Sequence, residues 1–438
     1  MVKPYLLLIQ LFLMPCILAF GQAIDSDQDP ESGRYTLIIE GFDWGPAVSR
    51  VILEPLDGQD SSEPTLSGNF NVQVERLSGC TKLEPWEARG QRRVTEAYRS
   101  DPEGNRQAEG THVTLELEVS PDLVLSNPFH YSNKDSCIGN DWVEYRLRIE
   151  DRGNGLTWSR EKGRQIPPLE PFDLDGRFTS EDGTVMSYAF YSPPSANEKQ
   201  ALIIWLHGGG EGGTDPSIPL LANRAANYAS PEIQEHFEGA YVLVPQCPGA
   251  WMHNAEGEVT WGRENDVYNV ALMELIRDFV ARHPEIDAKR IYVGGCSNGG
   301  YMSLKLILLH PDYFAAGFIS ALAYRSQYLT DEEIDIASGV PIWFIHSRDD
   351  GTTLPGETAV PVYKRLKAHG AKNVHLSLYD HVVDISGRFG GLERHYPGHW
   401  SWIYSHVNHC RLDFDGSPVK YGGKEVSLMS WLASQRNE

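Results

Sequence analysis

The sequence predicts two successive domains, an all-β sandwich followed by an α/β domain with a mainly parallel sheet. Two observations predict this organisation. Between residues 34 and 151, apolar and polar residues alternate in short runs, as in antiparallel strands that bury one face. Beyond residue 200 the apolar runs are continuous and alternate with helical patterns, as in strands covered by helices on both faces. We therefore expect the first domain over residues 32–165 and the second over residues 170–438.

Residues 1–21, which precede both domains, have the pattern of a secretory signal peptide. Lys3 is followed by an apolar run from Tyr5 to Phe20 and then by small residues. This run is shorter than the ~20 apolar residues that a membrane-spanning helix needs, and no later run is long and apolar enough. We therefore expect a protein that is secreted, to the extracellular space or the periplasm, without insertion into a membrane.

The net charge and the number of cysteines indicate which binding partners and which disulfides the protein can have. The formal net charge of −22 disfavours nucleic acid and anionic membranes as partners. Cys16 lies in the signal peptide, and the remaining cysteines are odd in number, so at least one is not in an intramolecular disulfide. Cys80 and Cys137 lie in the first domain, where they either form a disulfide or stay reduced. The others are Cys247, Cys296 and Cys410. Neither charge nor composition indicates an oligomeric state.

The strands of the first domain are predicted from alternating runs separated by Gly, Pro, Asp and Asn. These runs are "RYTLIIEGF", "SRVILEPL", "NFNVQVERL", "HVTLELEVS" and "WVEYRLRIE". Because no long amphipathic helix interrupts them, we expect a β-sandwich of immunoglobulin-like type. The stretch over residues 153–172 is rich in Gly, Pro and charged residues, which predicts a linker between the domains.

The second domain is predicted to begin with a hairpin that turns at Asp182-Gly183. Continuous apolar runs follow and predict buried strands, namely "ALIIWLHGG", "AYVLVPQC", "RIYVGGCS", "FAAGFISAL", "VPIWFIHS" and "VHLSLYD". Between two of these runs, apolar residues recur at helical spacing and predict a helix packed on the sheet: Tyr268, Leu272, Leu275, Ile276 and Phe279.

Ser297 stands out within "RIYVGGCSNGGYM", where the flanking residues are small. Residues 295–299 fit G-x-S-x-G, the nucleophile elbow of α/β-hydrolases. A tight glycine-rich turn is the alternative, since Gly tolerates unusual backbone angles. The context favours the elbow, because "RIYVGG" is a predicted strand and "NGGYMSLKLILLHP" a predicted helix ending before Pro311. We therefore expect an α/β-hydrolase catalytic domain with Ser297 as nucleophile.

An activated serine needs a base and an acid, which follow it in this fold in the order Ser, Asp or Glu, His. The strand "PIWFIHS" runs into a loop that holds Asp349 and Asp350, and "HYPGHWSWIY" later offers His395 and His399. His399 follows Pro-Gly and precedes an aromatic helix, which favours it as the base. As candidates for the acid, the order of the residues leaves Asp350 and Asp349 both open.

The glycine run in "IIWLHGGGEGG" predicts the site that stabilises negative charge on the reacting oxygen. We expect the backbone N–H groups of Gly209, Gly210 and Asn298 to form this oxyanion hole. Glu211, Trp251 and Trp400 are candidate substrate contacts, with packing beneath the loops as the alternative for the tryptophans. No dinucleotide, phosphate-loop or HExxH motif occurs, so we expect no cofactor and no metal.

Several stretches together resemble a known family. They are "LHGGGEGG", "VPQCPGAWM", "RIYVGGCSNGGYM", "PIWFIHSRDD", "YDHVVDISG" and "GHWSWIY", with "DWGPAVSRVIL" as a weaker likeness in the first domain. The chain resembles secreted α/β-hydrolase esterases of the polyhydroxybutyrate-depolymerase-like and prolyl-oligopeptidase-family type, which carry an N-terminal immunoglobulin-like domain. The resemblance implies Ser297, Asp350 and His399 as the triad and does not specify the substrate.

Two features differ from related families. The acid loop "HSRDDGTTLP" has two adjacent acids where similar proteins tend to have one. Cys296 beside the nucleophile is similar to feruloyl esterases and tannases, in which that cysteine pairs with one beside the catalytic histidine. Here no cysteine adjoins His399, and a pairing of Cys296 with Cys410 stays open.

These observations lead to one main hypothesis and two alternatives. The main hypothesis is a secreted serine hydrolase that acts on carboxylic esters, either small molecules or polymers. The alternatives are a serine peptidase of prolyl-oligopeptidase type and a binding or adhesion protein that has lost catalytic activity.

Overall fold

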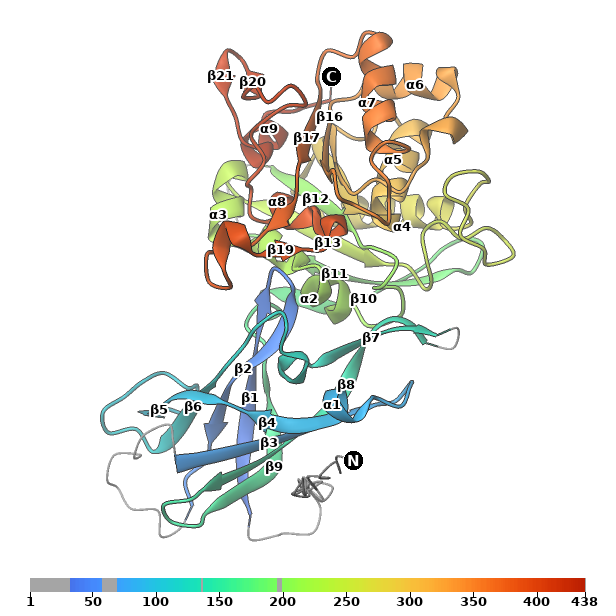
Figure 1. Cartoon of the computed structure of the whole chain (residues 1–438). Helices are drawn as coiled ribbons and strands as arrows, with labels where there is room; N and C mark the ends of the chain where they lie inside the picture. Colours follow the sequence, from blue (N-terminus) through green and yellow to red (C-terminus); the bar gives the residue numbers. More distant parts are fainter. Residues whose placement is uncertain (1–31, 57–68, 135–136, 195–198, 438) are drawn as a thin grey trace, which may run out of the picture.

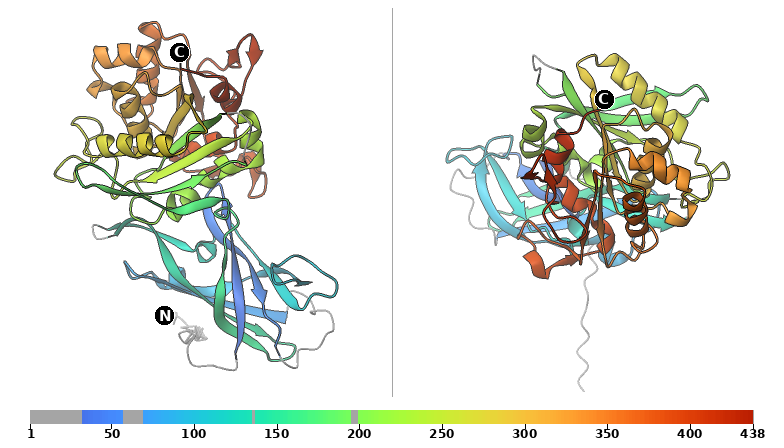
Figure 2. Two further views of the ribbon diagram at one scale, coloured as in Figure 1. Left: turned by 180° about the vertical axis from the view of Figure 1, so that it is seen from behind. Right: turned by 90° about the horizontal axis from the view of Figure 1, so that it is seen from above.

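The computed structural model describes residues 32–56, 69–134, 137–194 and 199–437. The predicted signal peptide lies outside these residues. Figure 1 shows two parts stacked end to end, an all-β part from the N-terminal third of the chain and an α/β part from the remainder. Figure 2 shows the same division from behind. The fold class expected from the sequence is therefore confirmed.

The N-terminal domain consists of strands that are hydrogen-bonded in the order β4-β3-β8-β9-β1-β2-β6-β5, with β7 added beside β8. Every pairing is antiparallel except that of β1 with β9. The strands are β1 (Gly33–Phe42), β2 (Gly45–Leu53), β3 (Phe70–Ser78), β4 (Arg89–Arg92), β5 (Val94–Ser100), β6 (His112–Leu117), β7 (Phe129–Lys134), β8 (Cys137–Asp151) and β9 (Thr157–Gln165); a single turn of helix, α1 (Pro85–Ala88), precedes β4.

A single apolar core holds this domain together. It joins inward-facing residues of β1, β2 and β6 with those of β3 and β8, so that the sheet wraps around a common interior as in a sandwich. The alternation in the sequence arises because every second residue of these strands enters the core. In β8, for example, Tyr145, Leu147 and Ile149 are buried, whereas Glu144, Arg148 and Glu150 are exposed.

The predicted linker over residues 153–172 is wrong in its central part. Thr157–Gln165 form β9, which pairs with β1 and β8 and belongs to the N-terminal sheet. Besides this pairing, Trp158 anchors the segment, because its ring is fully buried and its Nε1–H donates to the carbonyl oxygen of Glu54 at 2.9 Å.

The second domain contains an eight-stranded sheet of order β10-β11-β13-β12-β14-β15-β16-β17. The first two strands form the predicted hairpin and are antiparallel, and the strands from β13 to β17 are mutually parallel. The strands are β10 (Phe172–Thr179), β11 (Val185–Tyr191), β12 (Gln200–Leu206), β13 (Ala240–Gln246), β14 (Ile286–Cys296), β15 (Ala316–Ser320), β16 (Ile342–Ser347) and β17 (Val374–Tyr379).

Helices cover both faces of this sheet. Successive residues of β12 enter different apolar clusters, with Leu202 and Ile204 on one face and Ile203 and Trp205 on the other. Burial on both faces explains why the sequence shows continuous apolar runs. Helices α4 (Asn269–Arg282), α5 (Asn298–Leu309), α6 (Asp331–Ser338) and α7 (Ala359–Ala368) pack on the first face, and α2 (Ser217–Ala222), α3 (Pro231–Gln234), α8 (Trp402–His406) and α9 (Leu428–Ala433) on the second. Within the described ranges, no helix has the length and apolar character needed to cross a membrane.

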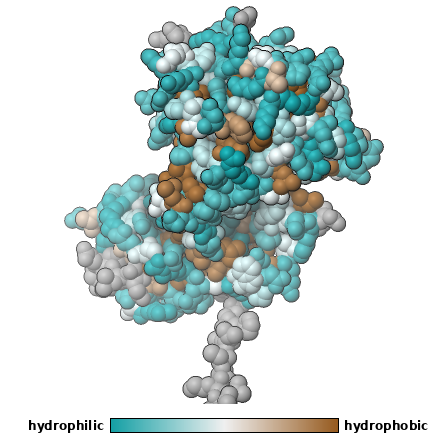
Figure 3. Space-filling model, turned by 45° about the horizontal axis from the view of Figure 1, so that its top comes forward, coloured by the Kyte–Doolittle hydropathy of each residue, from teal (hydrophilic) through white to brown (hydrophobic). Residues whose placement is uncertain are grey.

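The two domains meet along one edge of the α/β domain. The β1–β2 hairpin and the region of β7 reach from the N-terminal domain to this edge (Figure 1). Trp142 Nε1–H of β8 donates to Ser217 Oγ of α2 at 3.1 Å, and Arg394 forms a two-pronged ion pair with Asp122 at 2.5 and 2.6 Å. Figure 3 shows hydrophilic side chains over most of the face it presents, with hydrophobic side chains gathered near the junction.

Candidate active site

Three chain segments that carry the predicted chemistry leave the sheet at the same edge. Residues 207–211 follow β12, Ser297 follows β14, and the loop with Asp349 and Asp350 follows β16. Because these strands are parallel, their carboxyl ends lie side by side, which is where α/β sheets bind ligands. His399 lies in the segment after β17, just before α8.

Ser297 occupies the sharp turn between β14 and α5. Its backbone has φ 54° and ψ −112°, a conformation that L residues rarely adopt. The turn requires glycine on both sides of the serine. A Cβ at Gly299 would lie 2.0 Å from the carbonyl oxygen of Leu206, and a Cβ at Gly295 would lie 2.6 Å from the carbonyl oxygen of Gly299. The small residues therefore allow α5 to approach β12 closely, as the elbow motif predicts.

Asp350 and His399 are in direct contact. His399 Nδ1–H donates to the Asp350 carboxylate, at 2.9 Å from Oδ2 and 3.1 Å from Oδ1. Asp350 is only 2% exposed and also accepts hydrogen bonds from the backbone N–H groups of Thr352 and Thr353 at 2.8 and 2.9 Å. Burial alone would raise the pKa of Asp350, but the hydrogen bonds from His346, His399 and Thr353 hold it well below its usual range. The carboxylate is therefore ionised and orients the imidazole.

Asp349, the alternative acid, contacts a different histidine. Its Oδ2 accepts from His381 Nδ1–H at 2.8 Å, and its Oδ1 accepts from the hydroxyl of Ser347. The His399 loop still approaches this residue closely, since a Cβ at Gly398 would lie 2.7 Å from the Asp349 carbonyl carbon. Of the two adjacent acids, Asp350 is the one that contacts His399.

The glycine loop after β12 is held by the buried side chain of His207. The Nδ1–H of His207 donates to the carbonyl oxygen of Gly208 at 2.7 Å, and Nε2 accepts from the backbone N–H of Cys247 at 3.0 Å. Burial lowers the pKa of His207 to about 4, so the ring is neutral near pH 7 and can make both bonds. Gly209, Gly210 and Asn298 all line the same cavity as Ser297 and His399.

That cavity has a volume of about 530 Å³ and is lined by both domains. The α/β domain contributes the residues named above and several apolar groups. The N-terminal domain contributes Asp43, Trp44, Gly45, Pro46, Asn127, Phe129, Tyr131 and Asn140. Aromatic and apolar side chains are prominent in its wall: Trp44, Phe129, Tyr131, Met252, Val259, Trp261, Trp400 and Trp402. A cavity of this size and character suits a small or medium-sized organic group.

The three candidate substrate contacts have different positions. Trp400 lines the cavity. Trp251 does not: it is fully buried and packs against His207 with ring centroids 5.1 Å apart, so its assignment as a substrate contact is wrong and packing is its role. Glu211 also lines the cavity, but this residue is only 6% exposed. Its carboxyl group is bound by Asn140, whose Nδ2–H donates to Oε1 at 3.0 Å.

Sequence reasoning missed the cavity residues of the N-terminal domain and Trp261. The signal for part of this set was present, because Asp43, Trp44 and the two residues after them begin "DWGPAVSRVIL", the stretch with a weaker family likeness. Tyr131 and Asn140 lie in short polar segments without a recognisable motif. Among the residues that the structure describes, no group of three or more His, Cys, Asp or Glu is arranged to hold a metal ion.

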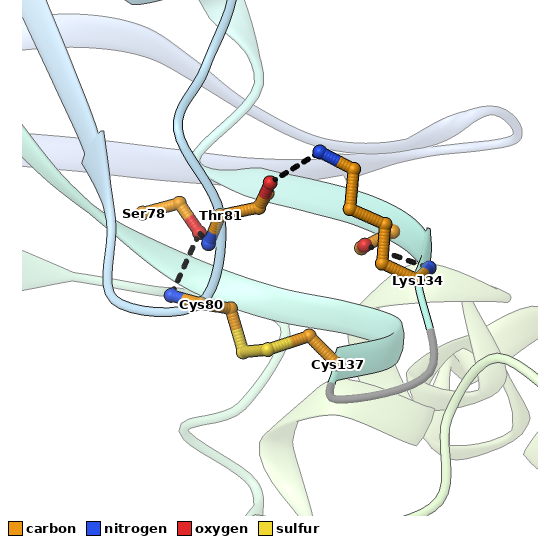
Figure 4. Close-up of a disulfide and its surroundings, with 6 residues drawn as sticks. Ser78, Cys80, Thr81, Lys134 and Cys137 are labelled. Carbon is orange, nitrogen blue, oxygen red and sulfur yellow. Dashed lines mark hydrogen bonds between the residues drawn. A yellow bond between two sulfur atoms is a disulfide. The ribbon is translucent and has the colours of Figure 1, made fainter.

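The cysteines divide into one disulfide and three buried thiols. Cys80 and Cys137 form a disulfide with an S–S distance of 2.05 Å, which is the first of the two possibilities left open by the sequence (Figure 4). Cys247, Cys296 and Cys410 are free and buried, so the structure contains no bond between Cys296 and Cys410.

The fold and the catalytic-loop geometry define a two-domain α/β-hydrolase with an immunoglobulin-like N-terminal domain. The family model described as the esterase Ig-like N-terminal domain matches residues 34–161, and the one described as the prolyl oligopeptidase family matches residues 257–338. These matches agree with the resemblance and confirm the fold class expected from the sequence, an α/β-hydrolase domain preceded by an immunoglobulin-like domain.

Individual relatives are similar over part of the chain. Identity is 32% over 127 residues to "Feruloyl esterase B" of Neurospora crassa, covering 29% of this chain and 40% of that protein. It is 29% over 150 residues to "Poly(3-hydroxybutyrate) depolymerase" of Ralstonia pickettii, covering 32% of this chain and 29% of that protein. The chain thus spans less than half the length of either relative.

One solved structure matches both domains together. It is described as "Crystal Structure of a Thermostable Esterase", covers 92% of this chain and 99% of its own, and has a TM-score of 0.70 at 24% identity. This match confirms the two-domain fold.

Proposed function

We propose that this protein is a serine carboxylic-ester hydrolase with Ser297 as nucleophile, His399 as general base and Asp350 as the acid that orients it. The observation that carries the proposal is that Ser297, His399 and the glycine loop line a single cavity, with Asp350 bonded to His399 behind it. Such a constellation can perform acyl transfer without a cofactor.

The first half of the reaction forms an acyl-enzyme. Ser297 Oγ attacks the ester carbonyl carbon while its proton passes to Nε2 of His399. The carbonyl oxygen becomes an oxyanion, which accepts hydrogen bonds from the backbone N–H groups of Gly209, Gly210 and Asn298. Collapse of the tetrahedral intermediate breaks the bond to the alcohol oxygen, which takes the proton from His399 and leaves.

The second half repeats these steps with water. His399 accepts a proton from a water molecule as the water oxygen attacks the acyl carbon. The intermediate collapses, Ser297 Oγ recovers the proton, and a carboxylic acid leaves. Asp350 stays ionised throughout and stabilises the imidazolium that forms in each half.

The substrate class we propose is an ester with an apolar or aromatic group. The tryptophan-rich wall of the cavity supports this class, because apolar surface is released from water when such a group binds. The two curated relatives, whose names refer to a feruloyl ester and a hydroxybutyrate polyester, support an ester in either a small molecule or a polymer.

We also propose that the protein is exported. The pattern of residues 1–21 supports export, and so does the Cys80–Cys137 disulfide, since disulfides persist mainly in oxidising compartments.

Replacement of the proposed nucleophile and base tests the function. The Ser297→Ala and His399→Ala variants should each lose on the order of 10⁴–10⁶ in kcat for a p-nitrophenyl ester, with unchanged thermal unfolding. Ser417→Ala, at an exposed position, and His395→Ala, an exposed histidine four residues before His399, serve as matched controls and should keep full activity. Activity close to that of the wild type in purified Ser297→Ala would contradict the proposal.

A further inference from the structure

The N-terminal domain touches the oxyanion loop at Asn140 in β8. The backbone N–H of Asn140 donates to the carbonyl oxygen of Gly210 at 2.7 Å. Its side-chain Nδ2–H donates to Glu211 Oε1 at 3.0 Å and lies 3.4 Å from the same Gly210 oxygen. One residue of the first domain thus holds two consecutive residues of the loop.

The contact is close enough to require glycine on both sides. Gly139 has φ +110°, and a Cβ there would lie 2.6 Å from the Gly210 carbonyl oxygen. A Cβ at Gly210 would lie 2.8 Å from the Tyr131 ring. The N-terminal domain therefore packs directly on the loop, with the backbone at Gly139 against the Gly210 carbonyl and the Tyr131 ring against the Gly210 Cα.

The loop is fixed from the α/β domain as well. Gln246 Nε2–H, at the end of β13, donates to the carbonyl oxygen of Glu211 at 3.0 Å. His207 holds Gly208 as described above. Among the described residues, the Gly210 carbonyl oxygen accepts hydrogen bonds only from Asn140, whereas the N–H of the same peptide, that of Glu211, donates to the carbonyl oxygen of Gly208 at 3.4 Å. The neighbouring domain therefore fixes the carbonyl side of the peptide that follows Gly210, and the loop itself fixes the N–H side.

We propose that Asn140, contributed by the immunoglobulin-like domain, is a positioning residue for the oxyanion hole. It holds Gly210 and Glu211 so that the N–H groups of the loop face the reacting oxygen. Asn140 acts through Gly210 and not on the substrate, and the inference rests on the proposed function.

The attachment of β8 supports this role. Asn140 lies three residues after Cys137, which the disulfide ties to Cys80, two residues beyond the end of β3 (Figure 4). Lys134, at the end of β7, donates to Thr81 Oγ1 at 3.0 Å and adds a second link to the same segment. The start of β8, which carries Asn140, is thus anchored within its own domain by the disulfide and by this hydrogen bond.

The test compares Asn140→Ala and Gly139→Ala with the wild type in the full-length protein. Asn140→Ala removes the side-chain hydrogen bonds and keeps the backbone bond, and Gly139→Ala places a methyl group against the Gly210 oxygen. With a p-nitrophenyl ester, kcat should fall about 10- to 100-fold in Asn140→Ala and further in Gly139→Ala, with KM within about twofold. Asn133→Ala, at an exposed position of β7 in the same hairpin, is the matched control and should retain kcat.

The measured split between kcat and KM distinguishes the outcomes. A lower melting temperature with kcat unchanged in Asn140→Ala would overturn the inference, because the contact would then only join the domains. A raised KM with unchanged kcat would also overturn it, because Asn140 would then bind substrate. If the wild type itself hydrolyses no ester, the proposed function fails first; if the wild type is active and Asn140→Ala keeps its kcat, only this inference fails.

Discussion

Asp349 and Asp350 are adjacent in the sequence, yet each carboxylate faces a different histidine. The chain turns after β16, so that Asp350 is buried against His399 while Asp349 points toward His381 near the surface. The residue types in "HSRDDGTTLP" do not by themselves distinguish the two acids, and only the family resemblance implied Asp350. The difference arises from the backbone N–H groups of Thr352 and Thr353, which donate to Asp350 only in the folded loop.

Asparagine substitutions at the two positions should have very different effects. Asp350→Asn should lower kcat for a p-nitrophenyl ester on the order of 10³–10⁴-fold, because the amide cannot stabilise the imidazolium or hold the required tautomer. Asp349→Asn is the matched control and should stay within about tenfold of the wild type, because its partner His381 is half exposed. A larger loss in Asp349→Asn would move the acid to that residue.

Glu211 should make the free energy of unfolding decrease as the pH rises, which is opposite to the effect of a carboxylate in an ion pair. Burial raises the pKa of Glu211 to about 7, although the hydrogen bond from Asn140 lowers it. The ordinary value of 4.5 applies in the unfolded chain, so the folded state binds the proton more tightly. The contribution of this group to stability is therefore complete below pH 4.5 and is lost as pH rises to about 7.

Comparison with Glu211→Gln isolates this contribution. The free energy of unfolding of the wild type, relative to the variant, should fall by on the order of 1–3 kcal/mol between pH 4.5 and pH 8. Urea unfolding of both proteins at the two pH values provides the measurement, and other titrating groups cancel in the difference. A difference that does not change with pH would show that Glu211 is ionised over the whole range.

At the scale of secondary-structure elements, most of the fold follows from the sequence. Each of the six apolar runs of the second domain is a strand, because burial on both faces leaves a continuous apolar signal. β9 was not predicted because most of its residues are exposed or half-exposed. Within "TWSREKGRQ" only Trp158 and Ser159 are buried. A strand held by one buried ring and by backbone pairing leaves no periodic pattern.

The approach of α5 to β12 depends on Gly299. In Gly299→Ala, the new methyl group meets the Leu206 carbonyl oxygen and must displace the helix or the strand. We expect a loss of about 1–3 kcal/mol in the free energy of unfolding, together with reduced activity, because Ser297 is the N-cap residue of the same helix. Gly356→Ala, where no atom lies within 4 Å of the new Cβ, is the control and should unfold like the wild type. Equal unfolding of the two variants, measured in urea, would contradict this account of the elbow.

At the scale of the whole molecule, the sequence did not predict how the domains meet. Contacts such as Asn140 with Gly210 and Arg394 with Asp122 join residues far apart in the chain, and neither partner belongs to a pattern that indicates the other. The proposed triad residues, by contrast, follow strands in a known order, so the sequence alone could nominate them. The cavity is lined both by residues near the strand ends of the α/β domain and by residues of the N-terminal domain. The sequence therefore indicated only part of its lining.

The composite cavity predicts a preference for esters over amides. Its aromatic and apolar wall suits an acyl or aryl group, and an amine is a poorer leaving group than an alcohol. We expect kcat/KM for p-nitrophenyl butyrate to exceed that for a prolyl p-nitroanilide by at least about 100-fold, which corresponds to about 2.7 kcal/mol. Both constants should be measured on one preparation. A comparable or higher value for the anilide would support the peptidase alternative.

Covalent labelling of Ser297 tests the central claim most directly, because it detects the nucleophile itself. A p-nitrophenyl alkylphosphonate should add one phosphonyl group per chain, with release of one p-nitrophenol and loss of activity in proportion. Peptide mapping by mass spectrometry should place the adduct on Ser297, with labelling absent in Ser297→Ala and strongly slowed in His399→Ala. An adduct on another residue, or full ester hydrolysis by the labelled protein, would contradict Ser297 as the nucleophile.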